Sequence, residues 1–368
     1  MTIENITKYI ESWAPKGIAW DRDNVGLQVG ASQQKIKNIL LCLDVNKDVV
    51  ENAIKKKCNL IISHHPLFFN PIKRITSGDK ISDIITSLIK NEITLYSAHT
   101  NLDFTKDGVS FQLAKKLGLK SIKFLKNISE TLTKLVVFVP IDYTEKVAEA
   151  IHSSGGGVIG EYTNCSFRII GKGTFKGSDQ SNPTIGEKGK LEFADEVRLE
   201  VLVNNFDLPA VISAMKKVHP YEEVAYDLYP LLNENVNYGM GAIGILEKDL
   251  TQKEFLVYVS EKLGIKNFRY TVGKNRNIKV VAVCGGSGSD LLNTVIQQKA
   301  DAFITADVKY HTFQDAENRI LLIDAGHYET EIFILDEMKR RLKHFLSNSE
   351  TEIYKFNGST NPISFFNN

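Results

Sequence analysis

Cysteine is scarce in this chain of 368 residues. The four cysteines, Cys42, Cys58, Cys165 and Cys284, are scattered and include no C-x-x-C pair. This spacing is typical of reduced, buried side chains and not of a disulfide framework. It also excludes a zinc site built from thiolates, because such sites need closely spaced cysteines. Any bound metal must therefore be held by carboxylates and by some of the eight histidines.

The chain also lacks an excess of charge and a long hydrophobic run. Lys and Arg number 45 and Asp and Glu number 44, which leaves a net charge of +1. Dedicated nucleic-acid-binding proteins usually carry a basic surplus, so nucleic acid is not indicated as a partner, although a local basic patch is compatible with this total. The apolar runs are far shorter than the ~20 residues of a membrane span, and residues 1–9 contain no apolar signal region. We therefore expect a cytoplasmic protein without membrane contact.

Both ends of the chain alternate apolar, strand-like runs with amphipathic helical segments. Nearly continuous apolar runs are expected of strands that are covered on both faces, and strand–helix repetition is typical of an α/β layer with a largely parallel sheet. These runs occupy residues 38–44, 59–63, 93–98, 279–284, 302–305 and 320–324. The middle of the chain differs, because it reads strand–helix–strand twice, which is the order of a ferredoxin-like domain. We therefore predict a duplicated α/β core of residues 1–128 and 238–368, interrupted by an inserted α+β domain of residues 129–237.

Two adjacent histidines, His64 and His65, end the apolar run at 59–63 and precede Pro66. Neighbouring side chains on a strand point to opposite faces, so both can serve one site only where the strand ends. Pro66 keeps His65 in an extended conformation there. A pair of metal ligands and a pair of hydrogen-bonded structural histidines are both compatible with this pattern.

A second motif, His99-Thr-Asn-Leu-Asp103, follows the run at 93–98. Ligands of open α/β sheets bind outside the carboxyl ends of the strands. Asp103 can supply a carboxylate ligand there, and His99 can bind metal or transfer protons. Taken by itself, a loop aspartate is more often a turn former or a helix cap.

A third motif places His327 and Glu331 four residues apart at the start of a helix. Residues at this spacing share one face of a helix and can clamp a metal ion, whereas Glu329 faces elsewhere. A simple surface pair is the alternative.

The three motifs are more informative together than apart. They supply three imidazoles and two carboxylates, from His64, His65, Asp103, His327 and Glu331. This set exceeds what one catalytic ion with an open position takes, but it fits two ions that share a bridging carboxylate or hydroxide. Imidazole and carboxylate donors without thiolate suit zinc, iron or manganese, and we put zinc first.

Two other segments could contribute to a site. The Gly-Gly-Ser-Gly sequence at 285–288 could cradle a phosphate with its backbone amides. It lacks the P-loop lysine and the Rossmann spacing, which favours a tight turn. Asp307 and His311 follow the run at 302–305 and could orient a ligand or contact substrate, with helix capping as the alternative.

Five motifs in this order carry a family resemblance. They are DNVGLQVG at 23–30, SHHPL at 63–67, HTNLD at 99–103, GGSG at 285–288 and DAGHYETE at 324–331. The chain closely resembles the GTP cyclohydrolase one type two homologues, also called the NGG-one-interacting-factor-three-like family. The segment HPYEEVAYDLYP at 219–230 is similar to the inserted domain of the longer bacterial members, which is itself similar to the PII and CutA trimers.

The resemblance implies a duplicated three-layer α/β core with a PII/CutA-like insert. It also implies that His64, His65, Asp103, His327 and Glu331 bind two divalent metal ions, and that the chain forms a toroidal homohexamer with trimeric caps from the insert. One departure is Ala306, where many relatives carry glycine; it affects the loop that leads to His311 and no ligand.

From these observations we expect a metal-dependent hydrolase with a metal-bound hydroxide as the nucleophile. His99 and His311 are the candidates for proton transfer or substrate contact. The substrate is a small molecule; if it is GTP, attack falls at C8 of the purine ring, and phosphoester hydrolysis is the enzymatic alternative. The non-enzymatic alternative is a hexameric ring that binds metal and senses a ligand or partner without turnover.

Overall fold

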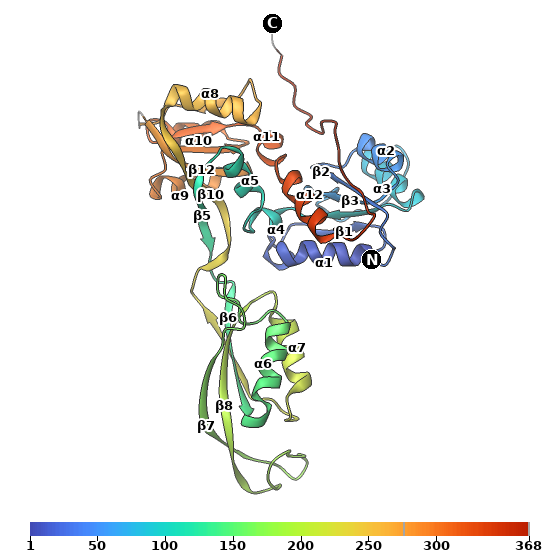
Figure 1. Cartoon of the computed structure of the whole chain (residues 1–368), viewed down its shortest axis with the longest axis vertical. Helices are drawn as coiled ribbons and strands as arrows, with labels where there is room; N and C mark the ends of the chain where they lie inside the picture. The colour runs from blue at the N-terminus through green and yellow to red at the C-terminus, as the bar shows by residue number, and fades with distance from the viewer. Residues whose placement is uncertain (275–276, 367–368) are drawn as a thin grey trace. The chain divides into compact units, whose positions relative to one another are not determined.

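The computed structural model describes residues 1–274 and 277–366, and the chain divides into two compact units. The larger unit combines residues 1–126 with residues 238–368, and the smaller unit comprises residues 127–237. The sequence analysis placed these borders at 128/129 and 237/238. Two long strands, β5 (Lys120–Ile128) and β10 (Asn235–Thr251), carry the chain out of the larger unit and back into it (Figure 1).

The first sheet of the larger unit has the strand order β1-β4-β3-β2-β15. Its strands are β1 (Gly26–Val29), β2 (Asn38–Cys42), β3 (Cys58–Ser63), β4 (Thr94–Ser97) and β15 (Ile353–Lys355). All neighbours are parallel except β1, which runs antiparallel to β4. A register of Leu40 opposite Ile61 and Leu41 opposite Ile62 aligns the buried runs of β2 and β3.

Helices cover both faces of this sheet, which explains why its strands are apolar at successive positions. Leu41 and Ile62 pack on the side of α1 (Ile3–Trp13) and α12 (Ile334–Phe345). The alternate residues, such as Leu40, face α2 and α3. The bounds of these two helices are Lys47–Lys55 and Lys80–Lys90.

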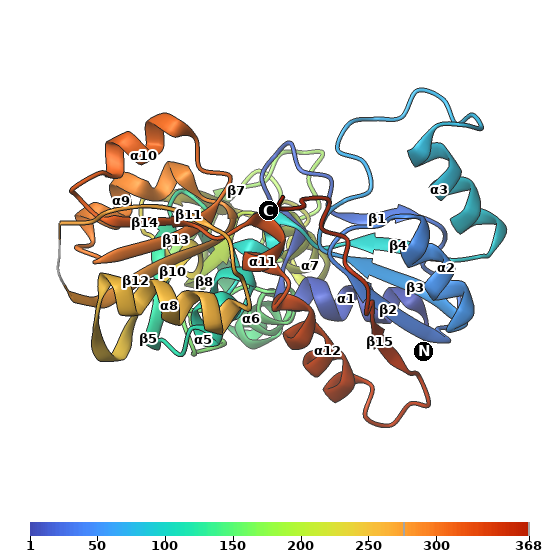
Figure 2. The ribbon, with the colours of Figure 1, turned by 90° about the horizontal axis from the view of Figure 1, so that it is seen from above.

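The second sheet repeats this three-layer arrangement with the order β11-β14-β13-β12-β10-β5. The central strands β12, β13 and β14 are parallel, β10 is antiparallel to β12, and β11 is antiparallel to β14. Helices α5 and α8 pack on one face and α9 and α10 on the other (Figure 2). The bounds are β11 (Arg269–Thr271), β12 (Asn277–Ser287), β13 (Ala302–Ala306), β14 (Leu321–Asp324), α5 (Val109–Lys116), α8 (Gln252–Leu263), α9 (Leu292–Gln297) and α10 (Tyr310–Ala316). The duplicated α/β core expected from the sequence is therefore confirmed.

The two halves exchange their ends. Helix α5, from the first half of the sequence, packs on the second sheet, whereas α12 and β15, near the end of the chain, complete the first. Two short helices, α4 (Thr100–Asp103) and α11 (His327–Glu331), directly precede these crossing segments. The exchange joins both sheets into one unit, and it leaves α4 and α11 at the carboxyl ends of β4 and β14.

The smaller unit is a ferredoxin-like α+β sandwich, as expected. Its sheet has the order β7-β8-β6-β9 with antiparallel pairing throughout, and α6 and α7 cover one face of it. The bounds are β6 (Leu132–Pro140), α6 (Thr144–Ser153), β7 (Phe167–Lys176), β8 (Leu191–Asn204), α7 (Leu208–Val218) and β9 (Tyr226–Leu231). Three single-turn helices complete the described elements, at Lys16–Ile18, Ile141–Tyr143 and Ser289–Leu291. None of the helices in the described residues is both long and apolar enough to cross a membrane.

Candidate metal centre

Three segments that lie far apart in the sequence meet in the larger unit, namely the end of β3, helix α4 and helix α11. His64 and His65 directly follow β3, and their backbone N–H groups donate to the carbonyls of Cys42 and Leu43 at 3.1 and 2.9 Å. The ladder between β2 and β3 thus continues through both histidines and fixes their backbone. The sheet therefore presents two imidazoles at its carboxyl edge.

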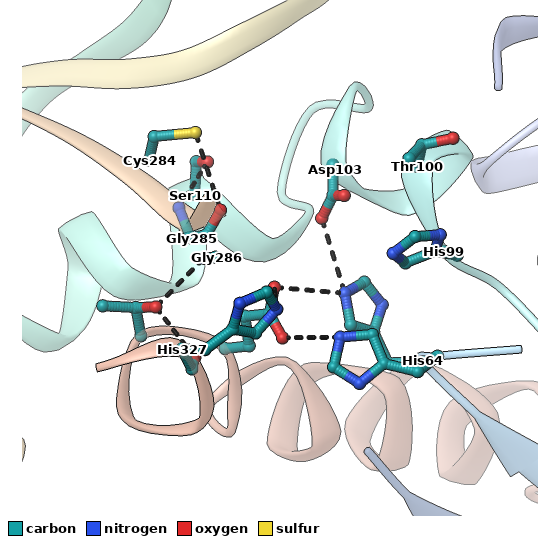
Figure 3. Close-up of polar contacts among 12 residues, drawn as sticks. His64, His99, Thr100, Asp103, Ser110, Cys284, Gly285, Gly286 and His327 are labelled. Carbon is teal, nitrogen blue, oxygen red and sulfur yellow. Dashed lines mark hydrogen bonds and ion pairs between the residues drawn. The ribbon is translucent and has the colours of Figure 1, made fainter. Parts of the chain in front are cut away.

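His64 is completely buried and points toward the two other segments. Its Nδ1 lies 2.9 Å from the carbonyl oxygen of Ala98, and its Nε2 lies 3.6 Å from Asp103 Oδ1 and 3.7 Å from Glu331 Oε1 (Figure 3). Burial lowers the pKa of His64. A neutral ring that donates from Nδ1 to the carbonyl leaves the lone pair of Nε2 facing the carboxylates.

His65 is held in the same manner by a carboxylate. Its Nδ1 lies 2.8 Å from Asp44 Oδ1, and its Nε2 lies 3.0 Å from Glu331 Oε2. Although burial alone would lower it, the contacts with Asp44 and Glu331 raise the pKa of His65 to about 10. Asp44 also accepts a 2.7 Å hydrogen bond from the hydroxyl of Thr360, so the tail of the chain holds this carboxylate in place.

His327, at the start of α11, completes the set of histidines around Glu331. Its Nε2 lies 3.1 Å from Glu331 Oε1, and its Nδ1 lies 2.6 Å from Asp307 Oδ2. Burial opposes protonation, but Glu331 and then Asp307 raise the pKa of His327 to about 9. Asp307 thus holds one ring nitrogen of His327, and its role in orienting a ligand stays a prediction.

The two carboxylates of the cluster have opposite electrostatic environments. Burial, and then the negative charge of Glu331, raise the pKa of Asp103 well above its ordinary value. Glu331 is only 3% exposed. Burial works against its charge, but the surrounding histidines hold the pKa of Glu331 well below its ordinary value.

Four buried polar atoms of this cluster have no hydrogen-bond partner in the described part of the chain. They are His64 Nε2, His65 Nε2, Asp103 Oδ1 and Glu331 Oε2. Their mutual contacts are close but lack the geometry of hydrogen bonds. A buried polar atom without a partner is costly, and such atoms are rare in native proteins. Imidazole nitrogens and carboxylate oxygens that converge in this way are ordinary metal donors, so the residues fit a metal ion.

Two overlapping groups of donors lie close enough to hold metal. His65, His327 and Glu331 bring one ligand atom each to within 4.8 Å of the others, and so do His64, His65 and His99. His99 thus belongs to the cluster that the sequence assigned to the other histidines. Its Nδ1 lies 2.9 Å from Asp23, which also accepts hydrogen bonds from the backbone and side chain of Thr100.

The absence of a side chain at Gly286 leaves room for the Glu331 carboxylate. Gly286 follows the buried part of β12 with a φ of +62°, and a Cβ at this position would lie 2.3 Å from Glu331 Oε1 and 3.2 Å from His327 Nε2. Two backbone amides of the 285–288 segment already have protein partners: Gly286 donates to Thr330 and Gly288 donates to Thr305. Residues 285–287 are the last residues of β12, where the pairing with β13 is irregular between Val283 and Ser287. The segment makes room for the cluster and is not a phosphate cradle.

The predicted site residues separate into two groups. The structure brings together His64, His65, Asp103, His327 and Glu331, with His99 beside them. His311 is exposed on α10, where its Nδ1 lies 2.9 Å from Gln314, and it does not line the cavity at the cluster. Its role in catalysis stays a prediction.

Sequence reasoning missed Asp23 and Asp44 as functional residues. Each holds the Nδ1 atom of a clustered histidine, as Asp307 does for His327. Asp23 opens the DNVGLQVG motif and Asp44 directly follows a buried strand. Their position in a loop and at a strand end was the feature of the sequence that could have indicated a role at the site.

A cavity of about 540 Å³ opens onto the cluster. His65, His99, Asp103, His327 and Glu331 lie in its wall. Exposed aromatic and aliphatic side chains contribute to the rest of its lining, namely Trp20, Phe69 and Ile363. The arrangement can admit a small molecule to the donor atoms and hold its apolar part.

Comparison with known proteins gives the same relatives by sequence and by structure. The family model described as Duf34/NIF3 (NGG1p interacting factor 3) matches residues 1–362. Proteins named GTP cyclohydrolase 1 type 2 homolog from Halalkalibacterium halodurans and Bacillus subtilis are 38% and 37% identical over 366 residues, which is 98% of this chain and of each relative. A Bacillus cereus protein related to NIF3 superposes with a TM-score of 0.82 at 36% identity, covering 100% of this chain and 99% of that one. Staphylococcus aureus protein SA1388 gives a TM-score of 0.79 at 28% identity with the same coverage.

Proposed function

Because the chain belongs to the Duf34/NIF3 (NGG1p interacting factor 3) family, we propose that it binds two divalent metal ions at the clustered histidines and carboxylates and uses them for hydrolysis. The four buried donor atoms without partners carry this proposal. A protein that folded around no ligand would gain nothing from leaving them unpaired in its interior.

The position of Glu331 supports two ions. Its Oε1 faces His64 and His327, and its Oε2 faces His65. A carboxylate that reaches histidines on both sides suits a ligand shared between two ions, with Asp103 as the second carboxylate. The donors admit zinc, iron or manganese, and zinc stands first because imidazole and carboxylate are both among its common ligands.

When bound, such a metal pair would lower the pKa of a water molecule and stabilise charge on the oxygens of a substrate. The protein supplies the remaining functions. Asp44, Asp307 and the carbonyl of Ala98 orient three of the rings. Asp23 holds the Nδ1 atom of His99. The other ring nitrogen, Nε2, would then be the atom that gives or takes a proton in the cavity.

The relatives' names point to GTP as the first substrate to test. Hydrolysis would then add water at C8 and open the imidazole ring of guanine. The cavity wall holds Trp20 and Phe69, whose rings can pack against a planar base. Phosphoesters are the second substrate class.

We further propose that the chain assembles as a toroidal homohexamer through its smaller unit. The strands β7 and β8 expose several large apolar side chains, which supports burial against further copies of the chain. They are Phe167, Ile169, Ile170, Leu191 and Phe193, with exposed fractions from 46% to 75%.

The proposed function is tested by metal analysis followed by assays with GTP and phosphoesters. We expect two ions per chain in the wild-type protein and turnover that Glu331→Gln abolishes together with most of the metal. Glu329→Gln, on the same helix but directed at Asn361, is the control and should keep both. Unchanged metal content in Glu331→Gln would refute the site. Two bound ions without turnover of either substrate class would refute hydrolysis and indicate a metal-dependent regulatory protein.

A further inference from the structure

The smaller unit contains a cavity of about 610 Å³. It lies between β7, β8, the loop at 177–190 and the segment that follows α7. The loop closes over it by two hydrogen bonds, from the backbone N–H of Asn182 to Glu222 and from the hydroxyl of Thr184 to the carbonyl of Pro220, both at 2.8 Å. None of the residues of the metal centre lines this cavity.

A buried carboxylate forms part of its wall. Glu196 on β8 is only 9% exposed, and the ion pairs of the described residues leave it without a cation. Its carboxylate lies against the backbone of Gly173, where a Cβ would come within 2.1 Å of Oε2. A carboxylate removed from water without a positive partner is expensive, so this position is explained if a ligand supplies the charge.

A second polar group next to Glu196 also lacks a partner. The hydroxyl of Tyr221 is buried and makes no hydrogen bond within the described chain. Burial, and then the nearby Glu196 carboxylate, raise the pKa of Tyr221. The phenol is thus in polar contact with the Glu196 carboxylate, although the pair does not have the full geometry of a hydrogen bond. A ligand between the two could donate to both oxygens.

The rest of the lining indicates the chemistry of the ligand. Three carboxylates, Glu196, Glu222 and Glu223, contribute to the wall, against one lysine, Lys176. Aromatic rings of Phe138, Phe175 and Tyr221 form apolar parts of the wall, and the rings of Phe175 and Tyr221 lie 6.3 Å apart. Acidic groups beside aromatic faces favour a cation with an apolar body, because both the carboxylate and the ring faces attract positive charge.

We propose that this cavity binds a small organic amine in its ammonium form. The ammonium group donates hydrogen bonds to Glu196 and Tyr221, and the apolar body packs against the aromatic rings. The inserted domain is then a ligand-binding module with its own specificity, independent of whether the metal centre hydrolyses its substrate.

The experiment measures binding to the intact protein by isothermal titration calorimetry with probes of one shape and different charge. Tryptamine is the cation, tryptophol the neutral analogue and indole-3-acetate the anion. We expect saturable binding of tryptamine at one site per chain and affinities about 10-fold to 100-fold lower for the other two, since a charge-assisted contact is lost. Equal binding of all three probes, or no tryptamine binding at millimolar concentration, would overturn the proposal. Absence of tryptamine binding is also the result expected if a side chain from a second copy of the chain fills the cavity.

Two variants locate the site. Glu196→Gln keeps the size of the side chain and should weaken tryptamine binding by the same factor. Asp195→Asn changes the neighbouring carboxylate, which is exposed and pairs with Lys172, and should leave binding unchanged. Tyr221→Phe removes only the unpartnered hydroxyl and should weaken binding less than Glu196→Gln. Light scattering and thermal unfolding confirm that each variant keeps the wild-type assembly. Unchanged affinity in Glu196→Gln would refute the site.

Discussion

Each histidine of the candidate metal centre is held at one ring nitrogen so that the other faces the cluster. The holding groups are a carbonyl for His64 and carboxylates for His65, His99 and His327. Such partners fix the tautomer and the ring orientation of a ligand and commonly change metal affinity about 10-fold to 100-fold when removed. Single substitutions of these holding groups should therefore change metal affinity strongly.

Asp44→Asn should weaken metal binding about 10-fold to 100-fold. The amide can still accept from the hydroxyl of Thr360, but it no longer offers a charged acceptor to His65 Nδ1. Competition with a chromogenic chelator measures the affinity. Asp48→Asn is the control, because Asp48 is exposed in the first turn of α2 and should leave affinity unchanged. Equal affinity in the two variants would show that Asp44 does not orient a ligand.

Asp23→Asn should reduce turnover about 10-fold to 100-fold, since a misplaced base loses much of its 10²–10⁴-fold contribution. Although burial would raise it, hydrogen bonds from His99 and Thr100 lower the pKa of Asp23 to about 2, so the carboxylate is charged across the working pH range. Metal content and the unfolding midpoint should stay close to wild type, which separates a role in proton transfer from a structural one. A loss of metal equal to the loss of rate would instead make His99 a ligand.

The sequence predicted the side chains that cluster better than the groups that hold them. Adjacent histidines at a strand end and an i, i+4 pair are local patterns, so His64, His65, His327 and Glu331 could be found by inspection. The partners are nonlocal: 76 residues separate Asp23 from His99, and 21 separate Asp44 from His65. A single aspartate in a loop has many ordinary roles, so no local pattern distinguishes these two.

At the scale of elements, the irregular end of β12 matters most for the site. Gly286 combines a left-handed φ of +62° with a close approach to Glu331. The sequence is compatible with a phosphate cradle or a tight turn. The occupied amides exclude the cradle, and the structure extends β12 to Ser287 where a turn was the alternative. Gly286 is needed because the side chain of Glu331 on α11 occupies the space that a Cβ would take.

Gly286→Ala should therefore lower both stability and metal content. A Cβ 2.3 Å from Glu331 Oε1 must displace the carboxylate, and the left-handed backbone adds about 1 kcal/mol. Gly264→Ala shares the backbone cost, with a φ of +71°, but a Cβ there meets nothing within 4 Å. We expect both variants to unfold at lower temperature and only Gly286→Ala to lose metal, as measured by elemental analysis. Full metal content in Gly286→Ala would contradict the contact.

The sequence predicted the strands whose two faces are both covered by helices. Runs such as residues 38–44 and 302–305 are apolar at nearly every position, which is typical of buried parallel strands. The pairing of β15 with the first sheet could not be predicted from an apolar run. It has three residues, Ile353–Lys355, and its pairing with β2 joins parts of the chain more than 300 residues apart. Such a contact is decided by the packing of α12 and not by a local pattern.

At the scale of the whole molecule, metal should act as a stabilising ligand of the larger unit. Its donors come from both halves of the core, and an ion that binds only the folded state adds about 2.7 kcal/mol at 100 times its dissociation constant. Chelation should lower the unfolding temperature, and added zinc should restore it. The midpoint of Glu331→Gln should respond to neither treatment. An equal response of this variant would place the stabilising ion elsewhere.

Assembly is the remaining property at this scale, and the proposed hexamer would form through the smaller unit. Near-neutral charge removes long-range repulsion between copies, and exposed apolar side chains on β7 and β8 provide area to bury. Ile170 is 75% exposed in the single chain, so Ile170→Glu would place a charge in the proposed interface and should reduce the mass in solution from that of a hexamer to that of smaller species. Ile89→Glu, at a residue 58% exposed on α3 of the larger unit, is the matched control and should leave the mass unchanged. Multi-angle light scattering measures both. If Ile89→Glu dissociated the assembly and Ile170→Glu did not, the interface that holds the ring together would lie in the α/β core and not in the insert.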